Sequence, residues 1–369
     1  MKVLLFIGTI DFLLSAAVYT YCRLVFPFAR HAGFALVVFL LALYTLCSRL
    51  LPESLPLFFL KGSAWIGGLW IAVLHYTVLL ALVHLALFLL GKLFSLSLPH
   101  KAIGAAGFLF MAFFIAWGSW QAFHPVLRTE HIYTDKLPAG TVYRAAFATD
   151  LHLGRFLGRS YAETLTQRIN ELSPDIVLIS GDILDERQSY VDRENSLAPL
   201  AQLQAPFGVY MCFGNHDYLD DPSSWQDKLR ANHIQPLRNE TQIVNQQLKI
   251  TGLEDYSQEK ETTDMIRLSP DNGKYYSILL DHQPRRMEEA ASLGYDLYLA
   301  GHTHTGQLFP NRLITRAMYP LDYGRADFHG LTAITNNGYG FWGIPVRTEE
   351  APELVLLLIE GTGSAAAPQ

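Results

Sequence analysis

The chain has 369 residues, of which 50% are hydrophobic and 17% are charged, and its formal net charge is −6. This acidic balance and the lack of a basic run argue against nucleic acid as the main substrate, because duplex binding usually leaves a basic footprint. The three cysteines do not suggest an extracellular disulfide framework, since Cys22 and Cys47 fall in apolar stretches and Cys212 falls in a predicted strand.

Four apolar stretches occupy the first 123 residues, at positions 3–26, 34–50, 65–90 and 103–123. Each is close to the ~20 residues that a helix needs to cross a bilayer. A secretory signal would instead have one apolar core of about 7–15 residues. The sequence therefore predicts an all-α region of four transmembrane helices over residues 1–123, and thus a multi-pass membrane protein.

Ionisable side chains inside these stretches are costly at membrane depth, which makes them candidates for a functional role. They are Asp11, Arg23, His75 and His84. Arg23 can instead reach the membrane surface from a helix end. His75 and His84 are nine residues apart, which is about half a turn out of phase on an ideal helix, so they are not expected to form one site.

Charge bias does not decide the orientation in the membrane, because the positively charged residues divide equally between the two sides. A short basic start favours a cytoplasmic N-terminus. With four spans the region that follows them would then also be cytoplasmic, on the inner (plasma) membrane. The composition changes sharply near His124, and Pro125 and Pro138 follow, which predicts a linker over residues 124–141.

Beyond the linker, five apolar runs each end abruptly at polar side chains. The runs cover residues 144–149, 175–180, 208–213, 275–281 and 297–300, and they predict short buried strands. The polar residues that follow them are Asp150 and His152, Asp182, Asn215 and His216, His282, and His302 and His304. Ligands of open α/β sheets bind at the carboxyl ends of the strands, so these distant segments are expected to converge on one pocket.

The residue types favour a metal site. Carboxylates, imidazoles and one amide form a mixed oxygen and nitrogen donor set, which suits manganese, iron or zinc. Leaving His216 aside, seven candidate ligands would give two divalent ions about four protein groups each if one carboxylate bridges. Side chains two apart on an extended chain point the same way, so Asp150 and His152 are expected to face one cluster. Asn215 and His216 point apart, which suggests a ligand and a proton-transfer group.

The ordered set D-x-H, G-D, G-N-H-D, H and G-H-x-H resembles the calcineurin-like metallophosphoesterase superfamily over residues 143–361. The resemblance implies an α+β fold, a four-layer αββα sandwich over residues 142–361, followed by a disordered tail at 362–369. It also implies two metal ions that share Asp182. One would be held with Asp150, His152 and His304, and the other with Asn215, His282 and His302. His216 would lie near the leaving oxygen and would be oriented by Asp185.

Within the superfamily the chain looks most like a membrane-associated branch that includes the UDP-2,3-diacylglucosamine hydrolases of lipid A synthesis. The resemblance implies a phosphodiesterase or pyrophosphatase, with manganese among the candidate metals, acting on a lipid-linked phosphate. The expected partners are the lipid bilayer and this substrate, with no obligate protein partner. Two apolar stretches beside the site, 156–157 and 339–342, favour a membrane interface or, equally, ordinary loop packing.

Two arginines are weaker candidates. Arg155 and Arg347 are predicted to hold phosphate oxygens through the guanidinium fork, or else to be structural. Two other functions stay open. One is a phosphodiesterase on the outer face that acts on envelope polymers or nucleotides. The other is a non-catalytic membrane protein whose metal centre is structural.

Overall fold

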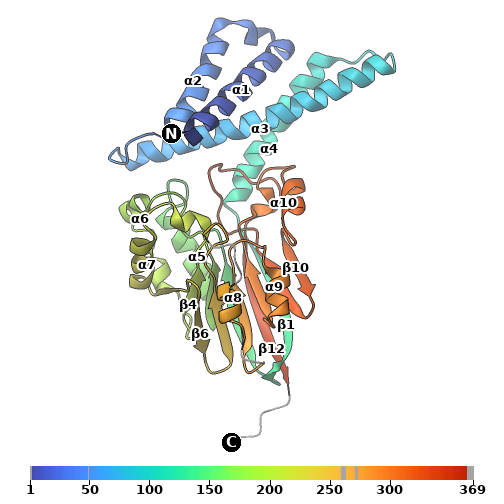
Figure 1. Cartoon of the computed structure of the whole chain (residues 1–369). Coiled ribbons are helices and arrows are strands. Elements are labelled where there is room, and N and C mark those ends of the chain that lie inside the picture. The colour runs from blue at the N-terminus through green and yellow to red at the C-terminus, as the bar shows by residue number, and fades with distance from the viewer. Residues whose placement is uncertain (1, 49, 259–262, 271–272, 364–369) are drawn as a thin grey trace, which may run out of the picture. The chain divides into compact units, whose positions relative to one another are not determined.

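The computed structural model describes residues 2–48, 50–258, 263–270 and 273–363. The internal contacts of the chain divide it into two units (Figure 1). The helical unit comprises Met1–Trp120 and Gly343–Thr348, and the sheet unit comprises Gln121–Trp342 and Glu349–Gln369. The chain therefore returns to the helical unit for six residues after it has formed most of the sheet unit.

Four helices make up the N-terminal part of the chain: α1 (Lys2–Val25), α2 (Ala32–Ser48), α3 (Leu57–Leu93) and α4 (His100–Ala122), with a short 3-10 helix η1 (Pro27–Arg30). By length and composition, α3 and α4 are long and apolar enough to cross a membrane, whereas α2 is a shorter apolar helix. The presence of four helices is confirmed. That all four cross a bilayer stays a prediction.

The helix α3 is longer than the predicted span 65–90. Its 37 residues would extend about 55 Å at 1.5 Å per residue, whereas the hydrocarbon core of a bilayer is roughly 30 Å thick. Small residues of α4 lie against neighbouring side chains: a Cβ on Gly104 would come 2.6 Å from Val25, and one on Gly107 would come 2.3 Å from Leu80. The glycines thus allow close helix packing.

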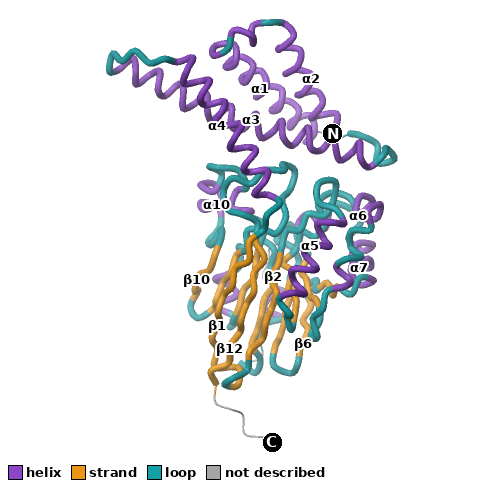
Figure 2. The backbone as a smooth tube through the Cα atoms, turned by 180° about the vertical axis from the view of Figure 1, so that it is seen from behind, coloured by secondary structure: helices purple, strands orange, loops and turns teal. Residues whose placement is uncertain are grey.

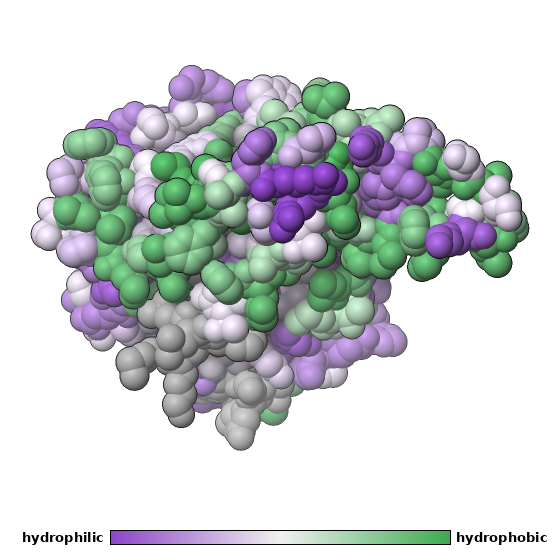
Figure 3. All heavy atoms as spheres, turned by 90° about the horizontal axis from the view of Figure 1, so that it is seen from above, coloured by the Kyte–Doolittle hydropathy of each residue, from purple (hydrophilic) through white to green (hydrophobic). Residues whose placement is uncertain are grey.

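Apolar side chains remain on the surface of these helices. Figure 3 shows hydrophobic residues gathered over this part of the molecule, and Phe12, Leu36, Phe58 and Leu109 are among the exposed ones. Contiguous exposed apolar surface of this kind marks an interaction site or a membrane contact.

The two histidines of α3 belong to different environments, as their spacing predicted. His84 lies between Tyr21, whose hydroxyl is 2.9 Å from Nδ1, and His100, whose Nδ1 is 3.0 Å from Nε2. His75 and Asp11 instead line a cavity of about 230 Å³ together with apolar side chains and Thr45.

Two six-stranded sheets form the centre of the sheet unit. The first has the strand order β1 (Val126–Pro138), β12 (Glu353–Gly363), β2 (Val142–Ala148), β3 (Ile176–Ser180), β4 (Val209–Cys212) and β5 (Ile234–Pro236). The second has the order β10 (Gly324–Phe328), β11 (Leu331–Thr335), β9 (Leu297–Ala300), β8 (Tyr276–Leu280), β7 (Leu248–Gly252) and β6 (Glu240–Val244).

Three apolar cores show the layering. Side chains of both sheets, such as Phe147 and Ile278, share the central core. A second core covers the outer face of the first sheet with α5 (Arg159–Glu171) and α7 (Pro222–Ala231). A third joins the second sheet to α9 (Met287–Ser292). Helix, sheet, sheet and helix therefore follow one another, which confirms the two-sheet α/β sandwich.

The remaining short helices of the sheet unit lie in its loops. They are α6 (Gln188–Glu194), α8 (Thr263–Arg267), α10 (Arg312–Met318) and the 3-10 helices η2 (Leu200–Gln202), η3 (Asn215–Tyr218) and η4 (His304–Gly306).

All five predicted strands are present, as β2, β3, β4, β8 and β9. The predicted linker over residues 124–141 is wrong for most of its length, because Val126–Pro138 forms β1 and pairs in parallel with β12. The predicted tail over 362–369 also begins too early, since β12 continues to Gly363. Residues 364–369 lie outside the described residues.

Strand direction places the site. In the first sheet β2, β3 and β4 run parallel, and in the second β8, β9 and β11 do so. Figure 2 shows the loops of the sheet unit gathered around the ends of these strands. The segments that follow the carboxyl ends therefore lie near one another although they are far apart in sequence.

Candidate metal centre

The structure brings the predicted ligands together. In the described part of the chain, three groups of side chains place one donor atom each within 4.8 Å of the others. The groups are Asp150, His152 and His304; His152, Asp182 and His216; and Asp182, His282 and His302. Because His152 and Asp182 each belong to two groups, the three form one continuous cluster.

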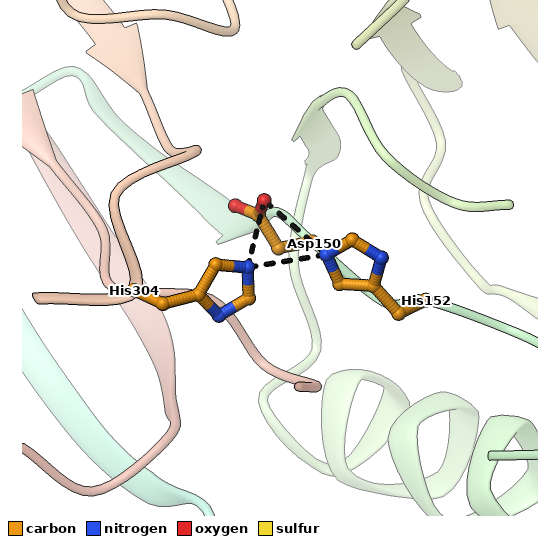
Figure 4. A group of neighbouring side chains, drawn as sticks. All are labelled: Asp150, His152 and His304. Atoms are coloured by element: carbon orange, nitrogen blue, oxygen red, sulfur yellow. Dashed lines mark hydrogen bonds and ion pairs between the residues drawn. The ribbon is translucent and has the colours of Figure 1, made fainter. Parts of the chain in front are cut away.

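The first group has converging donors (Figure 4). His304 Nε2 lies 3.2 Å from Asp150 Oδ1 and 3.1 Å from His152 Nε2. His152 Nε2 is 3.7 Å from the same carboxylate oxygen. All three side chains are buried. Two imidazole nitrogens and a carboxylate oxygen thus point at one small volume, which is the arrangement of ligands around a cation.

The group of Asp182, His282 and His302 has the same character. His282 Nε2 lies 3.2 Å from Asp182 Oδ2 and 3.2 Å from His302 Nδ1. The other ring nitrogen of His282 donates to the carbonyl oxygen of Ser180 at 2.7 Å. This bond holds Nε2 toward the group, as outer partners of ligating histidines commonly do. Asp182 Oδ2 is also 3.9 Å from His152 Nε2, so Asp182 lies between the two groups.

Among the predicted ligands, two buried oxygens lack hydrogen bonds in the described structure, namely Asp150 Oδ1 and Asn215 Oδ1. A buried acceptor without a donor is costly, and bound divalent cations would satisfy these two atoms. The mixed carboxylate, imidazole and amide donors suit such an ion. The residues therefore fit the two divalent ions that the sequence predicted, although their geometry does not select manganese, iron or zinc.

The backbone conformation at the ligands differs from the extended one that was expected. Five predicted ligands have positive φ angles: Asp150 (55°), His152 (48°), Asp182 (54°), His302 (73°) and His304 (46°). Asp150 and His152 do face one cluster, as predicted. The reason given for that prediction, an extended chain, is wrong. Three of the five ligand segments thus turn through the left-handed region directly after their strands, a conformation that non-glycine residues rarely adopt.

Electrostatics keep the carboxylates ionised. Burial alone would raise the pKa of Asp150 and Asp182, but the facing histidines, above all His304 and His282 respectively, lower both. Burial would lower the pKa of His152, yet the neighbouring carboxylates of Asp150 and Asp185 raise it to about 10. Burial and the charge of His282 lower the pKa of His302 to about 4. Buried carboxylates thus face imidazoles across the whole cluster.

His216 lies beside these groups and is only half-buried. Its Nδ1 is 2.5 Å from the backbone carbonyl oxygen of Asp185, whereas the Asp185 carboxylate is 3.7 Å away. That carboxylate is closer to His152 Nδ1, at 3.3 Å. Asp185 therefore does meet His216, but through its main chain. The predicted catalytic roles of both residues stay predictions.

Asp217 supports the site in a way that the sequence reasoning missed. It is fully buried and accepts hydrogen bonds from the backbone N–H groups of Asp182 and Leu184 and from the indole of Trp225. Burial and the charge of Asp182 raise the pKa of Asp217 to about 6. Its only signal was its place as the last letter of the G-N-H-D block.

The loop after β11 was also missed. Gly340 N–H donates to the carbonyl oxygen of Asp150, and Tyr339 N–H donates to that of Thr149. The loop therefore lies against a ligand segment. Tyr339, Phe341 and Leu157 are buried and Phe156 is half-buried, so much of the apolar material beside the site is loop packing. Trp342 is the exception, with half of its surface exposed.

The two predicted phosphate-binding arginines differ in their surroundings. Arg155 makes a two-pronged ion pair with Glu186, with N–O distances of 2.7 and 2.5 Å. Arg347 is fully buried in the segment assigned to the helical unit, and its backbone N–H donates to the carbonyl oxygen of Gly118. That either arginine holds phosphate stays a prediction.

Similarity to known proteins agrees with this geometry. Residues 143–306 match the calcineurin-like phosphoesterase family. An uncharacterized metallophosphoesterase of Aquifex aeolicus is 32% identical over 240 residues, which are 63% of this chain and 91% of that protein. The chain belongs to the calcineurin-like phosphoesterase family. It is therefore a hydrolase of phosphoester bonds, and the family implies divalent metal ions, with which the aspartate and histidine groups are compatible.

Two further relatives of this phosphoesterase bear on its architecture. An uncharacterized metallophosphoesterase of Helicobacter pylori is 30% identical over 276 residues, 70% of this chain and 72% of that protein. A zebrafish (Danio rerio) protein named "Transmembrane protein with metallophosphoesterase domain" is 31% identical over 334 residues, 79% of this chain and 74% of that protein. The long match to a transmembrane relative fits the two apolar helices α3 and α4.

Proposed function

We propose that this phosphoesterase is anchored in a membrane and hydrolyses phosphodiester or pyrophosphate bonds of a lipid-linked substrate at a dinuclear metal centre. The observation that carries the reaction class is the continuous cluster in which Asp182 belongs to donor groups on both sides. In the proposal one ion is held by Asp150, His152, Asp182 and His304, and the other by Asp182, Asn215, His282 and His302.

Two divalent ions supply stabilisation of the charge that builds on the phosphoryl oxygens during in-line displacement. The protein contributes the rest. Asp182 sets the spacing of the two halves of the site. His216, whose Nδ1 is held by the Asp185 carbonyl oxygen, keeps its other ring nitrogen for the leaving oxygen. Donation of a proton by such a group typically accelerates a reaction about 10²–10⁴-fold.

The lipid-linked substrate rests on a second set of observations. The ligand loop that holds His302 and His304 continues into a segment with several exposed apolar side chains, namely Phe309, Leu313, Ile314 and Met318. The chain also carries apolar helices long enough to cross a bilayer. A substrate with acyl chains would suit this combination, and UDP-2,3-diacylglucosamine is the specific case proposed. The proposed location is the inner membrane, as a multi-pass protein with a cytoplasmic sheet unit.

The deciding experiment is hydrolysis by the detergent-purified full chain after chelation and addition of Mn²⁺. Bis-p-nitrophenyl phosphate and UDP-2,3-diacylglucosamine would be compared, with Asp182→Asn as the inactive control. Metal-restored cleavage that favours the lipid nucleotide supports the proposal. Cleavage of the aryl diester alone retains the chemistry and rejects this lipid. Equal rates for wild type and Asp182→Asn would remove the dinuclear assignment.

Orientation has its own test. A reporter fused after Gln369 that is active only in the cytoplasm is expected to give a signal. A signal from an exported reporter at the same position would instead place the sheet unit on the outer face and favour envelope polymers or nucleotides as substrates.

A further inference from the structure

Trp342 is unusual among the aromatic residues of its loop. Tyr339 and Phe341 are fully buried, whereas Trp342 is 51% exposed. Its ring centroid lies 6.0 Å from that of His216, with the rings inclined by 60°. A large aromatic side chain thus borders the group proposed to face the leaving oxygen, and leaves part of its surface to solvent.

Trp342 borders one of the less buried groups of the cluster. Asp150, His152, Asp182, His282 and His304 are buried, while Asn215, His216 and His302 are only half-buried. His216, next to the indole, is thus among the groups of the cluster that solvent reaches. A phosphate ester bound at the cluster would project its remaining group past His216, where the indole lies.

The backbone of Trp342 is held at both polar atoms by one side chain. Its N–H donates to Gln307 Oε1 at 3.3 Å, and its carbonyl oxygen accepts from Gln307 Nε2 at 3.1 Å. Gln307 is itself buried and has a positive φ of 60°. It follows the ligand His304 by three residues, so this clamp ties the tryptophan to the ligand loop.

The start of the loop is held as firmly. Asn336 N–H donates to Ala300, Tyr339 N–H to Thr149 and Gly340 N–H to Asp150, all through backbone carbonyl oxygens. The position of the Trp342 backbone relative to the donor groups is therefore set before a ligand binds. Binding surfaces that are ordered in advance avoid the cost of ordering them on binding.

We propose that Trp342 is a specificity residue that stacks against a planar ring carried by the leaving group, such as an aryl ester or a nucleobase. The inference rests on the proposed function, because it needs a phosphate bound at the donor groups with its leaving group toward His216. Stacking of a base on an aromatic side chain strengthens binding by about 5- to 100-fold, as measured by alanine substitution. Gln307 acts as a positioning residue for this platform.

Binding of three phosphonates to the metal-loaded, detergent-purified full chain tests the proposal by calorimetry, without any need for turnover. Phenylphosphonate carries a planar ring, methylphosphonate lacks one, and octylphosphonate imitates an acyl chain. Wild type is expected to bind phenylphosphonate at least about fivefold more tightly than methylphosphonate. Trp342→Ala should abolish this preference without changing methylphosphonate affinity, and Trp342→Phe should retain most of it.

The matched control is Tyr133→Ala, which removes another exposed aromatic side chain, on β1, and should leave the preference intact. An unchanged preference in Trp342→Ala would overturn the proposal. Equal weakening of all three ligands would show that the residue only maintains the loop. A loss confined to octylphosphonate would assign the indole to acyl chains instead. Failure of the proposed function is separate, since it would appear as phosphonate binding without metal-dependent hydrolysis.

Discussion

Five of the residues that are proposed to supply metal donors have a strained backbone. Asp150, His152, Asp182, His302 and His304 all occupy the left-handed region, at a cost of about 1–3 kcal/mol each for non-glycine residues. Such conformations persist only when the surroundings enforce them. Here they do, since the Asp150 N–H donates to the Gly181 carbonyl and the Asp150 carboxylate accepts from His302 N–H.

The contribution of this packing can be tested at Gly338. Its φ is 91°, and a Cβ there would lie 2.9 Å from His304 Cε1 and 3.0 Å from Asp150 Cβ. Gly338→Ala is therefore expected to separate two ligands and to weaken metal binding at least about tenfold, besides costing about 1–3 kcal/mol of stability through φ. Titration with Mn²⁺ and thermal unfolding measure the two effects.

Gly330 provides the control for that variant. Its φ is 93°, but a Cβ at this position would meet nothing within 4 Å. Gly330→Ala should lose comparable stability and keep its metal affinity. Equal metal affinity in the two variants would contradict the claim that the loop after β11 positions the ligands.

His216 makes a different prediction, because it is proposed to act on the leaving group. His216→Ala should keep the ions, since seven other donors remain, and should lose about 10²–10⁴-fold in rate on diesters with poor leaving groups. The loss should be small for p-nitrophenolate, which leaves without protonation. A series of substrates that differ in leaving-group pKa measures this, and equal losses across the series would count against a proton-donor role.

At the scale of secondary structure, apolar runs were sufficient to predict β2, β3, β4, β8 and β9, because buried parallel strands are nearly continuous apolar sequence. The strand β1 escaped this reasoning. It lies at the edge of its sheet, so residues such as Arg128, Glu130 and His131 remain polar along it. Pro125 and Pro138 then resembled the ends of a linker, although they border and end the strand.

The residues of the site likewise divide into those that the sequence predicted and those that it did not. Ligand types and their order along the chain were visible because metal binding demands particular side chains. The supporting residues were not, since Asp217, Gln307 and Gly338 act through backbone hydrogen bonds or through the space they leave. Such roles depend on which loops meet, and that follows from strand order rather than from local sequence.

An ion pair between Arg128 of β1 and Glu353 of β12 is expected to contribute to the stability of the sheet unit. The guanidinium donates to both carboxylate oxygens of Glu353, at 2.9 and 3.0 Å, and Glu353 is fully buried. Arg128→Ala is expected to destabilise the sheet unit by about 2–4 kcal/mol, because it leaves a buried carboxylate without its charge partner. Thermal unfolding of the detergent-solubilised chain measures this.

Arg325→Ala is the comparison, since Arg325 is more exposed and lies 3.4 Å from Glu130. An exposed pair of this kind contributes about 0–1 kcal/mol. Similar destabilisation by the two substitutions would show that β1 gains no special stability from the Arg128–Glu353 pair.

At the scale of the whole molecule, the chain passes between its two units three times. It passes from the helical to the sheet unit after Trp120, returns directly after Trp342, and leaves again after Thr348. Within the helical unit the returning segment is bound to two helices, since Arg347 N–H donates to Gly118 of α4 and the Thr348 hydroxyl pairs with the Tyr76 hydroxyl of α3. Trp342, which is proposed to stack on the leaving group, is therefore joined by one peptide bond to a segment that is hydrogen-bonded to the apolar helices α3 and α4.

Removal of residues 1–120 tests whether metal binding and hydrolysis depend on the connection between Trp342 and the helical unit. Because all the donor groups belong to the sheet unit, the truncated chain is expected to bind two metal equivalents and to cleave bis-p-nitrophenyl phosphate at a rate within about tenfold of the full chain. Residues 343–348 would lose their partners on α3 and α4, which would loosen the position of Trp342 and reduce the preference for phenylphosphonate. A truncated chain that binds both ions but hydrolyses nothing would make the helices part of the active site. One that keeps the full ring preference would show that Gln307 alone is enough to hold the tryptophan in place.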